Sequence, residues 1–113
     1  MKNILIIEDQ DQFCELYKHD KTLKEHKIFF AEDVKKAEEK IKEKIWDVIV
    51  LDGCLNDEGK LNTLELIPII KEACPNVPII ANSSAYNAEL VSAGCTHTSY
   101  PKSFLSRRIL QLV

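Results

Sequence analysis

The sequence lacks the features that mark membrane proteins, secreted proteins and chains of several linked domains. It contains only three glycines and four prolines among 113 residues, and no segment has the composition of a linker. No apolar run approaches the roughly 20 residues that a membrane-spanning helix needs. The N-terminal segment turns acidic after Ile7, too early for the apolar stretch and cleavage site of a secretory signal. We therefore expect a single domain over residues 1–113, located in the cytoplasm and without a membrane partner.

The chain also lacks an excess of positive charge and any paired cysteine motif. Its formal net charge is -3, which argues against direct nucleic-acid binding because that function favours a basic face. Cys14, Cys54, Cys74 and Cys95 show neither Cys-x-x-Cys spacing nor a histidine at zinc-finger spacing. We interpret them as reduced thiols of a cytosolic protein, some of them buried.

Short apolar runs alternate with amphipathic segments along the whole chain. Four of the runs predict strands at residues 4–7, 28–31, 48–51 and 77–81, and a weaker, polar strand is expected at 96–100. Between them, apolar side chains recur every three or four residues, which predicts helices near residues 13–23, 34–45, 64–74, 87–93 and 105–113. Five alternations of strand and helix indicate an α/β fold with a doubly wound parallel sheet and helices on both faces.

Local signals suggest where some helices begin and end. Asn62 or Thr63 could cap the third helix. Pro68 should kink that helix unless it lies in the first turn. Gly94 suits the position that follows the fourth helix.

Charged and hydroxyl side chains follow the strands at the points where these end. In chain order they are Glu8, Asp9, Asp52, Ser83, Ser84 and Lys102. Each one alone would be an ordinary turn residue or a solvated side chain. Together, at the edge of a parallel sheet where ligands bind, they predict one shared site. Close carboxylates repel by roughly 4 kcal/mol per pair at an effective dielectric of about 20, so a hard divalent cation and the lysine are expected to offset them.

Six short segments match one family of signalling domains over essentially the whole chain. They are Ile-Leu-Ile-Ile-Glu-Asp at 4–9, Val-Ile-Val-Leu-Asp at 48–52, Leu-Glu-Leu-Ile at 64–67, Val-Pro-Ile-Ile at 77–80, Ala-Gly at 93–94 and Lys-Ser-Phe at 102–104. With these segments the chain resembles the receiver domain of two-component response regulators. The resemblance implies a flavodoxin-like sheet of five strands in the order 2-1-3-4-5.

The resemblance also implies an acceptor and a metal site. Asp52 would accept a phosphoryl group from a histidine kinase or a histidine phosphotransfer protein. Mg²⁺, or alternatively Mn²⁺, would be held by Asp52, by Asp9 directly and by Glu8 directly or through water. The backbone carbonyl of Cys54 would complete the protein ligands.

Two further residues would contact the phosphoryl group on the acceptor. Ser83 matches the switch hydroxyl, five residues beyond Pro78, with Ser84 as the competing assignment. Lys102 would pair with a phosphoryl oxygen. Phosphorylation would then shift an existing equilibrium toward an active conformation.

Several positions depart from the pattern of the family. Asn56 replaces the usual proline four residues after the acceptor, in a loop about three residues longer than usual. Lys102-Ser103 replaces the usual Lys-Pro pair, and Pro101 precedes the lysine, so that the Tyr100–Pro101 peptide could be cis or trans.

Other departures affect the residues that normally report and reverse phosphorylation. The usual aromatic switch position falls on Thr98 or Ser99, with Tyr100 adjacent. Cys54 and Ala85 occupy positions that influence dephosphorylation, and neither can act as a strong base, so we expect no fast self-dephosphorylation. We therefore have more reason to expect phosphorylation than the family's usual output mechanism.

Two functions remain open on the sequence, and two others have less support. The leading one is a phosphoacceptor domain that catalyses only its own phosphoryl transfer and slow dephosphorylation, signalling to a downstream protein or a fused output domain. The alternative is a phosphorylation-independent interaction or dimerisation module, and a homodimer is open in either case. A small enzyme such as a metal-dependent phosphatase has less support, as does flavin binding. The chain could stand alone or be a piece of a larger protein.

Overall fold

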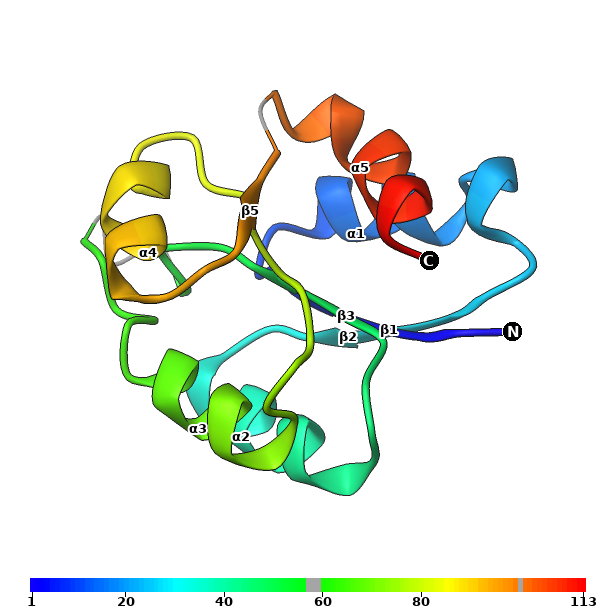
Figure 1. Ribbon diagram of the computed structural model, residues 1–113. Coiled ribbons are helices and arrows are strands. Elements are labelled where there is room, and N and C mark those ends of the chain that lie inside the picture. Colours follow the sequence, from blue (N-terminus) through cyan, green and yellow to red (C-terminus); the bar gives the residue numbers. More distant parts are fainter. Residues whose placement is uncertain (57–59, 100) are drawn as a thin grey trace.

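Five parallel strands form the centre of the molecule (Figure 1). The computed structural model describes residues 1–56, 60–99 and 101–113. The strands are β1 (Asn3–Ile7), β2 (Lys27–Ala31), β3 (Val48–Leu51), β4 (Ile79–Ala81) and β5 (His97–Thr98). They pair in the order β2-β1-β3-β4-β5. The predicted topology of the sheet is confirmed.

Helices cover both faces of this sheet. They are α1 (Asp11–Lys18), α2 (Val34–Glu43), α3 (Leu66–Ala73), α4 (Asn87–Ala93) and α5 (Leu105–Leu112), with short 3-10 helices η1 (Lys21–Leu23) and η2 (Lys102–Phe104). Figure 1 shows α1 and α5 on one side of the sheet and α2 and α3 on the other. In the described part of the chain, no helix combines the length and apolarity needed to cross a membrane.

The sheet separates two apolar cores, which explains why its strands are apolar without alternation. Ile4 and Ile6 pack toward α1 and α5, whereas Leu5 and Ile7 pack toward α2 and α3. All four side chains are completely buried. A central strand of a parallel sheet needs apolar side chains on both faces, so the run predicts burial rather than an exposed edge.

The start of α3 differs from the prediction. The helix begins at Leu66, and the residue before it, Glu65, occupies the N-cap position without a side-chain capping hydrogen bond. Thr63 instead donates its hydroxyl to the carbonyl oxygen of Asp52 at 2.7 Å. The side chain of Asn62 is hydrogen-bonded to the backbone of Leu55 in both directions, each at 2.9 Å. Both predicted caps were wrong because these side chains fasten the loop after β3 rather than the helix.

The remaining local predictions have mixed outcomes. Pro68 is the third residue of α3, where no helical hydrogen bond is lost. Gly94 ends α4 with a positive φ of 129°, as expected for this position. β5 is shorter than the predicted strand at 96–100. The prediction for the Tyr100–Pro101 peptide lies outside the described residues.

The first predicted helix is divided into two elements. α1 ends at Lys18, and η1 follows after a turn. The Asp20 side chain accepts the backbone N–H of Thr22 at 2.9 Å and thereby caps η1. This turn returns Leu23 to the core between α1 and α5.

Candidate functional site

Three carboxylates meet where β1 and β3 end. Ile7 and Leu51 are partners in the register of these neighbouring strands, so the residues that follow them reach the same edge of the sheet. Glu8, Asp9 and Asp52 each offer a carboxylate oxygen, and these oxygens lie within 4.8 Å of one another. The glutamate is 1% exposed and Asp52 is 4% exposed, so the repulsion between their negative charges is only weakly screened by water.

Lys102 supplies the opposite charge. Its Nζ lies 2.7 Å from Glu8 Oε1 and 3.2 Å from Asp52 Oδ2. The lysine is itself buried, with 8% of its surface exposed. It extends from η2, which follows β5, so the structure brings together residues from three separate strand ends.

Backbone N–H groups hold the carboxylates in fixed orientations. Gly53 donates to Asp52 Oδ1 at 2.7 Å, and Asp9 donates to Glu8 Oε2 at 3.1 Å. Asn56 donates to Asp9 Oδ2 at 2.7 Å. Asp9 Oδ1 is buried and has no hydrogen-bond partner among the described residues. A buried carboxylate oxygen without a donor beside two other carboxylates fits a bound cation, and three oxygen ligands suit Mg²⁺.

The protonation of this cluster follows from burial and charge. Burial and the neighbouring Asp52 charge raise the pKa of Glu8 to about 7, although Lys102 opposes the shift. Burial lowers the pKa of Lys102, but its hydrogen bond to Glu8 and the charge of Asp52 outweigh this effect and raise it overall. The lysine is therefore the stable positive charge of the site, and the raised pKa of Glu8 brings its protonation close to neutral pH.

The two candidate serines differ in their surroundings. Ser83 is 3% exposed, and its Oγ accepts the backbone N–H groups of Ala85 at 3.3 Å and Tyr86 at 3.1 Å. A Cβ built on Gly53 would lie 3.2 Å from this Oγ, so the hydroxyl faces the residue directly after the acceptor. Ser84 is exposed and lines a separate cavity with Lys102.

Gly53 and Thr63 belong to the site although the sequence analysis did not identify them. A Cβ at Gly53 would lie only 2.8 Å from Tyr86 Cβ, so a larger residue would displace the loop before α4. A glycine directly after an acidic strand end was a usable signal. The hydroxyl contact of Thr63 with the Asp52 backbone gave no signal, because it spans a loop whose path the sequence does not reveal.

The predicted role of Cys54 concerns its backbone carbonyl. The residue is half-buried and carries a free thiol two positions after Asp52. The metal-ligand role of this carbonyl stays a prediction.

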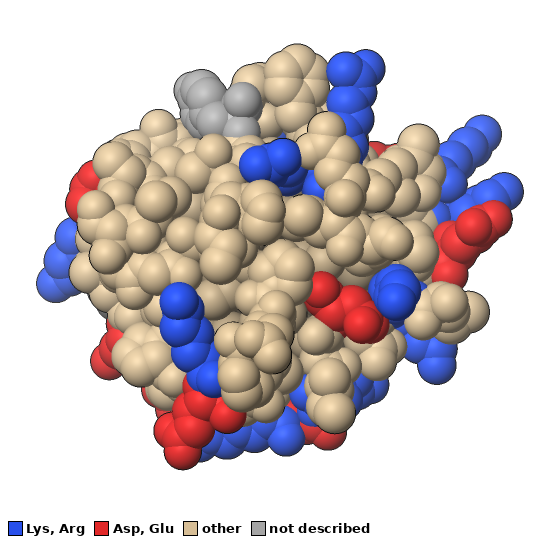
Figure 2. Space-filling model, viewed as in Figure 1, with Lys and Arg blue, Asp and Glu red and all other residues tan. Residues whose placement is uncertain are grey.

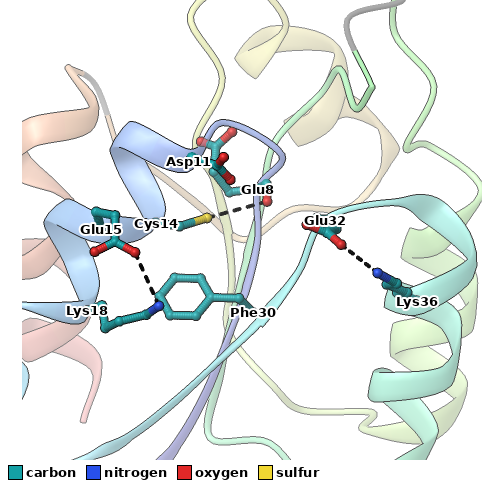
Figure 3. A pocket seen from close by; sticks show the side chains of 8 residues that line it. All are labelled: Glu8, Asp11, Cys14, Glu15, Lys18, Phe30, Glu32 and Lys36. Atoms are coloured by element: carbon teal, nitrogen blue, oxygen red, sulfur yellow. Dashed lines mark hydrogen bonds and ion pairs between the residues drawn. The ribbon is translucent and has the colours of Figure 1, made fainter.

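A neighbouring cavity of about 300 Å³ lies beside Glu8, on its side toward α1 and β2 (Figure 3). It is lined by Glu8, Asp11, Cys14, Glu15, Lys18, Phe30, Glu32 and Lys36. Lys18 pairs with Glu15 and Lys36 pairs with Glu32, so both lysines are neutralised within the cavity. Burial and nearby carboxylates raise the pKa of Cys14 to about 11, and its thiol donates to the Glu8 carbonyl oxygen. The Cys14 thiol therefore stays protonated and unreactive, and it only lines the cavity.

The structure is similar to solved receiver domains. One, from a sensor histidine kinase of Pseudomonas aeruginosa with a magnesium ion in the active-site cleft, has a TM-score of 0.78 and 20% identity, covering 98% of this chain and 96% of that one. A response regulator from Thermotoga maritima in complex with Mg²⁺ and BeF has a TM-score of 0.79 and 24% identity, with both chains fully covered. A response regulator from Burkholderia pseudomallei, with a phosphorylated aspartic acid and a calcium ion, has a TM-score of 0.74 and 18% identity, covering 98% of this chain and 72% of that one.

Sequence comparison gives no corresponding match. No protein-family model matches the chain, and no curated protein matches it. Identities of this size in solved structures show the fold alone. The chain has the flavodoxin-like fold of response regulator receiver domains.

Proposed function

We propose that the chain is a phosphoacceptor signalling domain in which Asp52 receives a phosphoryl group from a phosphohistidine. The observation that carries this proposal is the pairing of one buried lysine with two buried carboxylates. Lys102 contacts both Glu8 and Asp52, and Asp9 completes the cluster with an oxygen that has no donor among the described residues. Holding three mutually repelling carboxylates together costs free energy, and a bound cation or phosphoryl group would explain why the site keeps them.

The chemistry follows from the position of each group. A carboxylate oxygen of Asp52 forms the new O–P bond while the N–P bond of the donor imidazole breaks, and the bonding electrons stay with the imidazole nitrogen. Lys102 lies 3.2 Å from Asp52 and can neutralise charge on the transferring group. Gly53 fixes the other carboxylate oxygen, so the acceptor is already oriented.

A divalent metal ion fits the same cluster. Asp9, Asp52 and the Cys54 carbonyl would hold Mg²⁺, with Glu8 binding it directly or through water, and Mn²⁺ is an alternative with the same ligand preference. When bound, the ion would supply positive charge against the phosphoryl oxygens. The buried, unpartnered Asp9 Oδ1 supports this assignment.

Ser83 is the residue we assign as the switch hydroxyl. Its Oγ already accepts two backbone N–H groups, so its own proton remains available for a new acceptor near Gly53. A phosphoryl group on Asp52 would provide that acceptor and draw the loop between β4 and α4 toward the site. Ser84 is exposed, which makes it the weaker candidate.

The proposed partners follow from this chemistry. The donor is a histidine kinase or a histidine phosphotransfer protein in the cytoplasm, and the receiver of the signal is a downstream protein, a fused output domain or a second copy of the chain. Figure 2 shows mostly uncharged surface over α4 and β5, with lysines, arginines and acidic residues gathered toward the margins of this view. A face without a continuous basic patch suits a protein partner better than a nucleic acid.

Incubation with acetyl phosphate and Mg²⁺ tests the proposal directly. Intact-mass measurement should show one added phosphoryl group on the wild type and none on Asp52→Asn. Absence of labelling with every phosphoryl donor would overturn the proposal. Full biological activity of Asp52→Asn would instead favour the phosphorylation-independent interaction module.

A further inference from the structure

We propose that Tyr17 is a positioning residue that holds Lys102 in place for phosphoryl transfer. The Tyr17 hydroxyl donates to the backbone carbonyl oxygen of Lys102 at 3.1 Å, across 85 positions of sequence. This inference rests on the proposed function, because it assumes that the lysine ammonium contacts the transferring group.

Residues of helix α1 contact Lys102 both at its backbone carbonyl and at the ammonium group of its side chain. Tyr17 holds the carbonyl oxygen, and the ring of Phe13, one helical turn earlier, lies 4.7 Å from the ammonium nitrogen. The two rings are stacked with their centroids 6.4 Å apart. Lys102 begins the short helix η2 and therefore gains little support from regular secondary structure. The helix thus supplies the support that fixes where the ammonium points.

The tyrosine hydroxyl is itself oriented by a second buried residue. Asn82 Nδ2 donates to the Tyr17 hydroxyl oxygen at 3.3 Å, which leaves the hydroxyl proton for the Lys102 carbonyl. Burial raises the pKa of Tyr17 to about 12, so the hydroxyl keeps its proton in the physiological range. Asn82 directly precedes Ser83 at the end of β4. One buried chain of contacts therefore connects the lysine to the segment that carries the proposed switch serine.

Packing alone does not account for this arrangement. Tyr17 and Asn82 are each 1% exposed, and Asn82 Oδ1 has no hydrogen-bond partner among the described residues. An apolar pair of similar volume would fill the same space without the cost of burying these polar atoms. A role that needs the hydroxyl explains why the polar pair is present.

Tyr17→Phe is the main test, because it removes the hydroxyl and keeps the stacked ring. We expect the initial rate of phosphorylation by acetyl phosphate to fall about tenfold, which is less than the roughly hundredfold loss that a misplacement of about 1 Å can cause. The affinity for Mg²⁺ should stay within about twofold, because the carboxylates are unchanged. Thr96→Val is the matched control, since it removes a hydroxyl that bonds Ile79 far from the lysine. An unchanged rate in Tyr17→Phe would overturn the proposal.

A double-mutant cycle separates positioning from a general structural effect. In a Lys102→Ala background, Tyr17→Phe should cause no further loss of rate, because there is no ammonium left to position. A further loss of about tenfold in that background would contradict the positioning role. Asn82→Leu tests the same contacts from the other end and should lower the rate by about two- to threefold. If Tyr17→Phe folds poorly, Asn82→Leu takes its place as the test, and an unchanged rate in Asn82→Leu would then contradict the proposal.

A readout that does not involve phosphorylation keeps this inference distinct from the proposed function. The ammonium protons of Lys102 are buried in ion pairs, so their NMR signal should be observable through slow exchange with water. The signal should persist in Thr96→Val and broaden or shift in Tyr17→Phe. Its persistence unchanged in Tyr17→Phe would overturn the positioning role. If the signal depends on Tyr17 but the wild type accepts no phosphoryl group, the positioning role stands and the proposed function fails.

Discussion

Replacing Lys102 with methionine removes a buried positive charge and keeps a side chain of similar length. At an effective dielectric of about 20, charges 2.7 Å and 3.2 Å apart attract by roughly 6 and 5 kcal/mol before desolvation is subtracted. Because desolvation cancels much of this attraction, the net loss expected for breaking a buried pair is about 3–5 kcal/mol. The loss should depend on pH, since Glu8 can take up a proton when its partner is removed.

The sign of this dependence follows from the pKa of Glu8. Burial and the Asp52 charge raise this pKa from 4.5 to about 7 even with Lys102 present, and the lysine lowers it. In Lys102→Met the pKa of Glu8 should therefore rise further. A carboxyl group with a raised pKa in the folded state stabilises the protein at low pH, and this stabilisation is lost as pH rises through that pKa. In the variant, this stabilisation by protonated Glu8 is still being lost at pH values above 7, where the wild type has already lost it.

Urea denaturation in EDTA at pH 6 and pH 8.5 measures the effect. We expect Lys102→Met to lose about 3–5 kcal/mol of unfolding free energy at pH 8.5, and about 1–3 kcal/mol less than that at pH 6. Lys18→Met is the control, because the Lys18–Glu15 pair is exposed and should change stability by less than about 1 kcal/mol at either pH. A variant as stable as the wild type at pH 8.5, or a loss that is equal at both pH values, would refute the reasoning.

Three further predictions concern the loop after β3 and the metal site. Asn56→Pro should weaken Mg²⁺ binding by more than about tenfold in calorimetry, because it removes the N–H donor to Asp9 and forbids the positive φ of 66°. Asn56→Gly should bind Mg²⁺ as the wild type does, and equal Mg²⁺ affinities of Asn56→Pro and Asn56→Gly would contradict this reasoning. Asp9→Asn should abolish the rise in melting temperature that Mg²⁺ causes, and a retained rise would exclude Asp9 as a ligand. Gly53→Ala should cost about 1–3 kcal/mol in urea denaturation because its Cβ has no room, and an unchanged midpoint would contradict the contact geometry.

The sequence predicted those parts of the molecule that depend on the direction of the strands. Apolar runs buried on both faces define parallel strands, and parallel strands end at one edge of the sheet. The meeting of Glu8 and Asp52 follows from the ends of β1 and β3, which are neighbours in register. The same reasoning placed Ser83 and Lys102 at this edge.

The direction of the strands does not predict the contacts that backbone groups make. Asn56 stands where the family usually has proline, and its role became clear only from its positive φ and its N–H donated to Asp9. A proline could provide neither feature. Thr63 looked like a helix cap, but its hydroxyl bonds the Asp52 carbonyl, because the loop turns back to the strand end. The contact of Tyr17 with Lys102 joins two distant residues through a backbone carbonyl, which no side-chain pattern can indicate.

Identification of the modified residue tests the central claim most directly. The protein would be treated with acetyl phosphate and Mg²⁺, reduced with borohydride, which converts a phosphoaspartate to homoserine, and mapped by peptide mass spectrometry. The account predicts a single modified position, Asp52, with slower modification in Lys102→Met. Modification at another carboxylate while Asp52 stays unmodified, or no modification of the wild type, would contradict it.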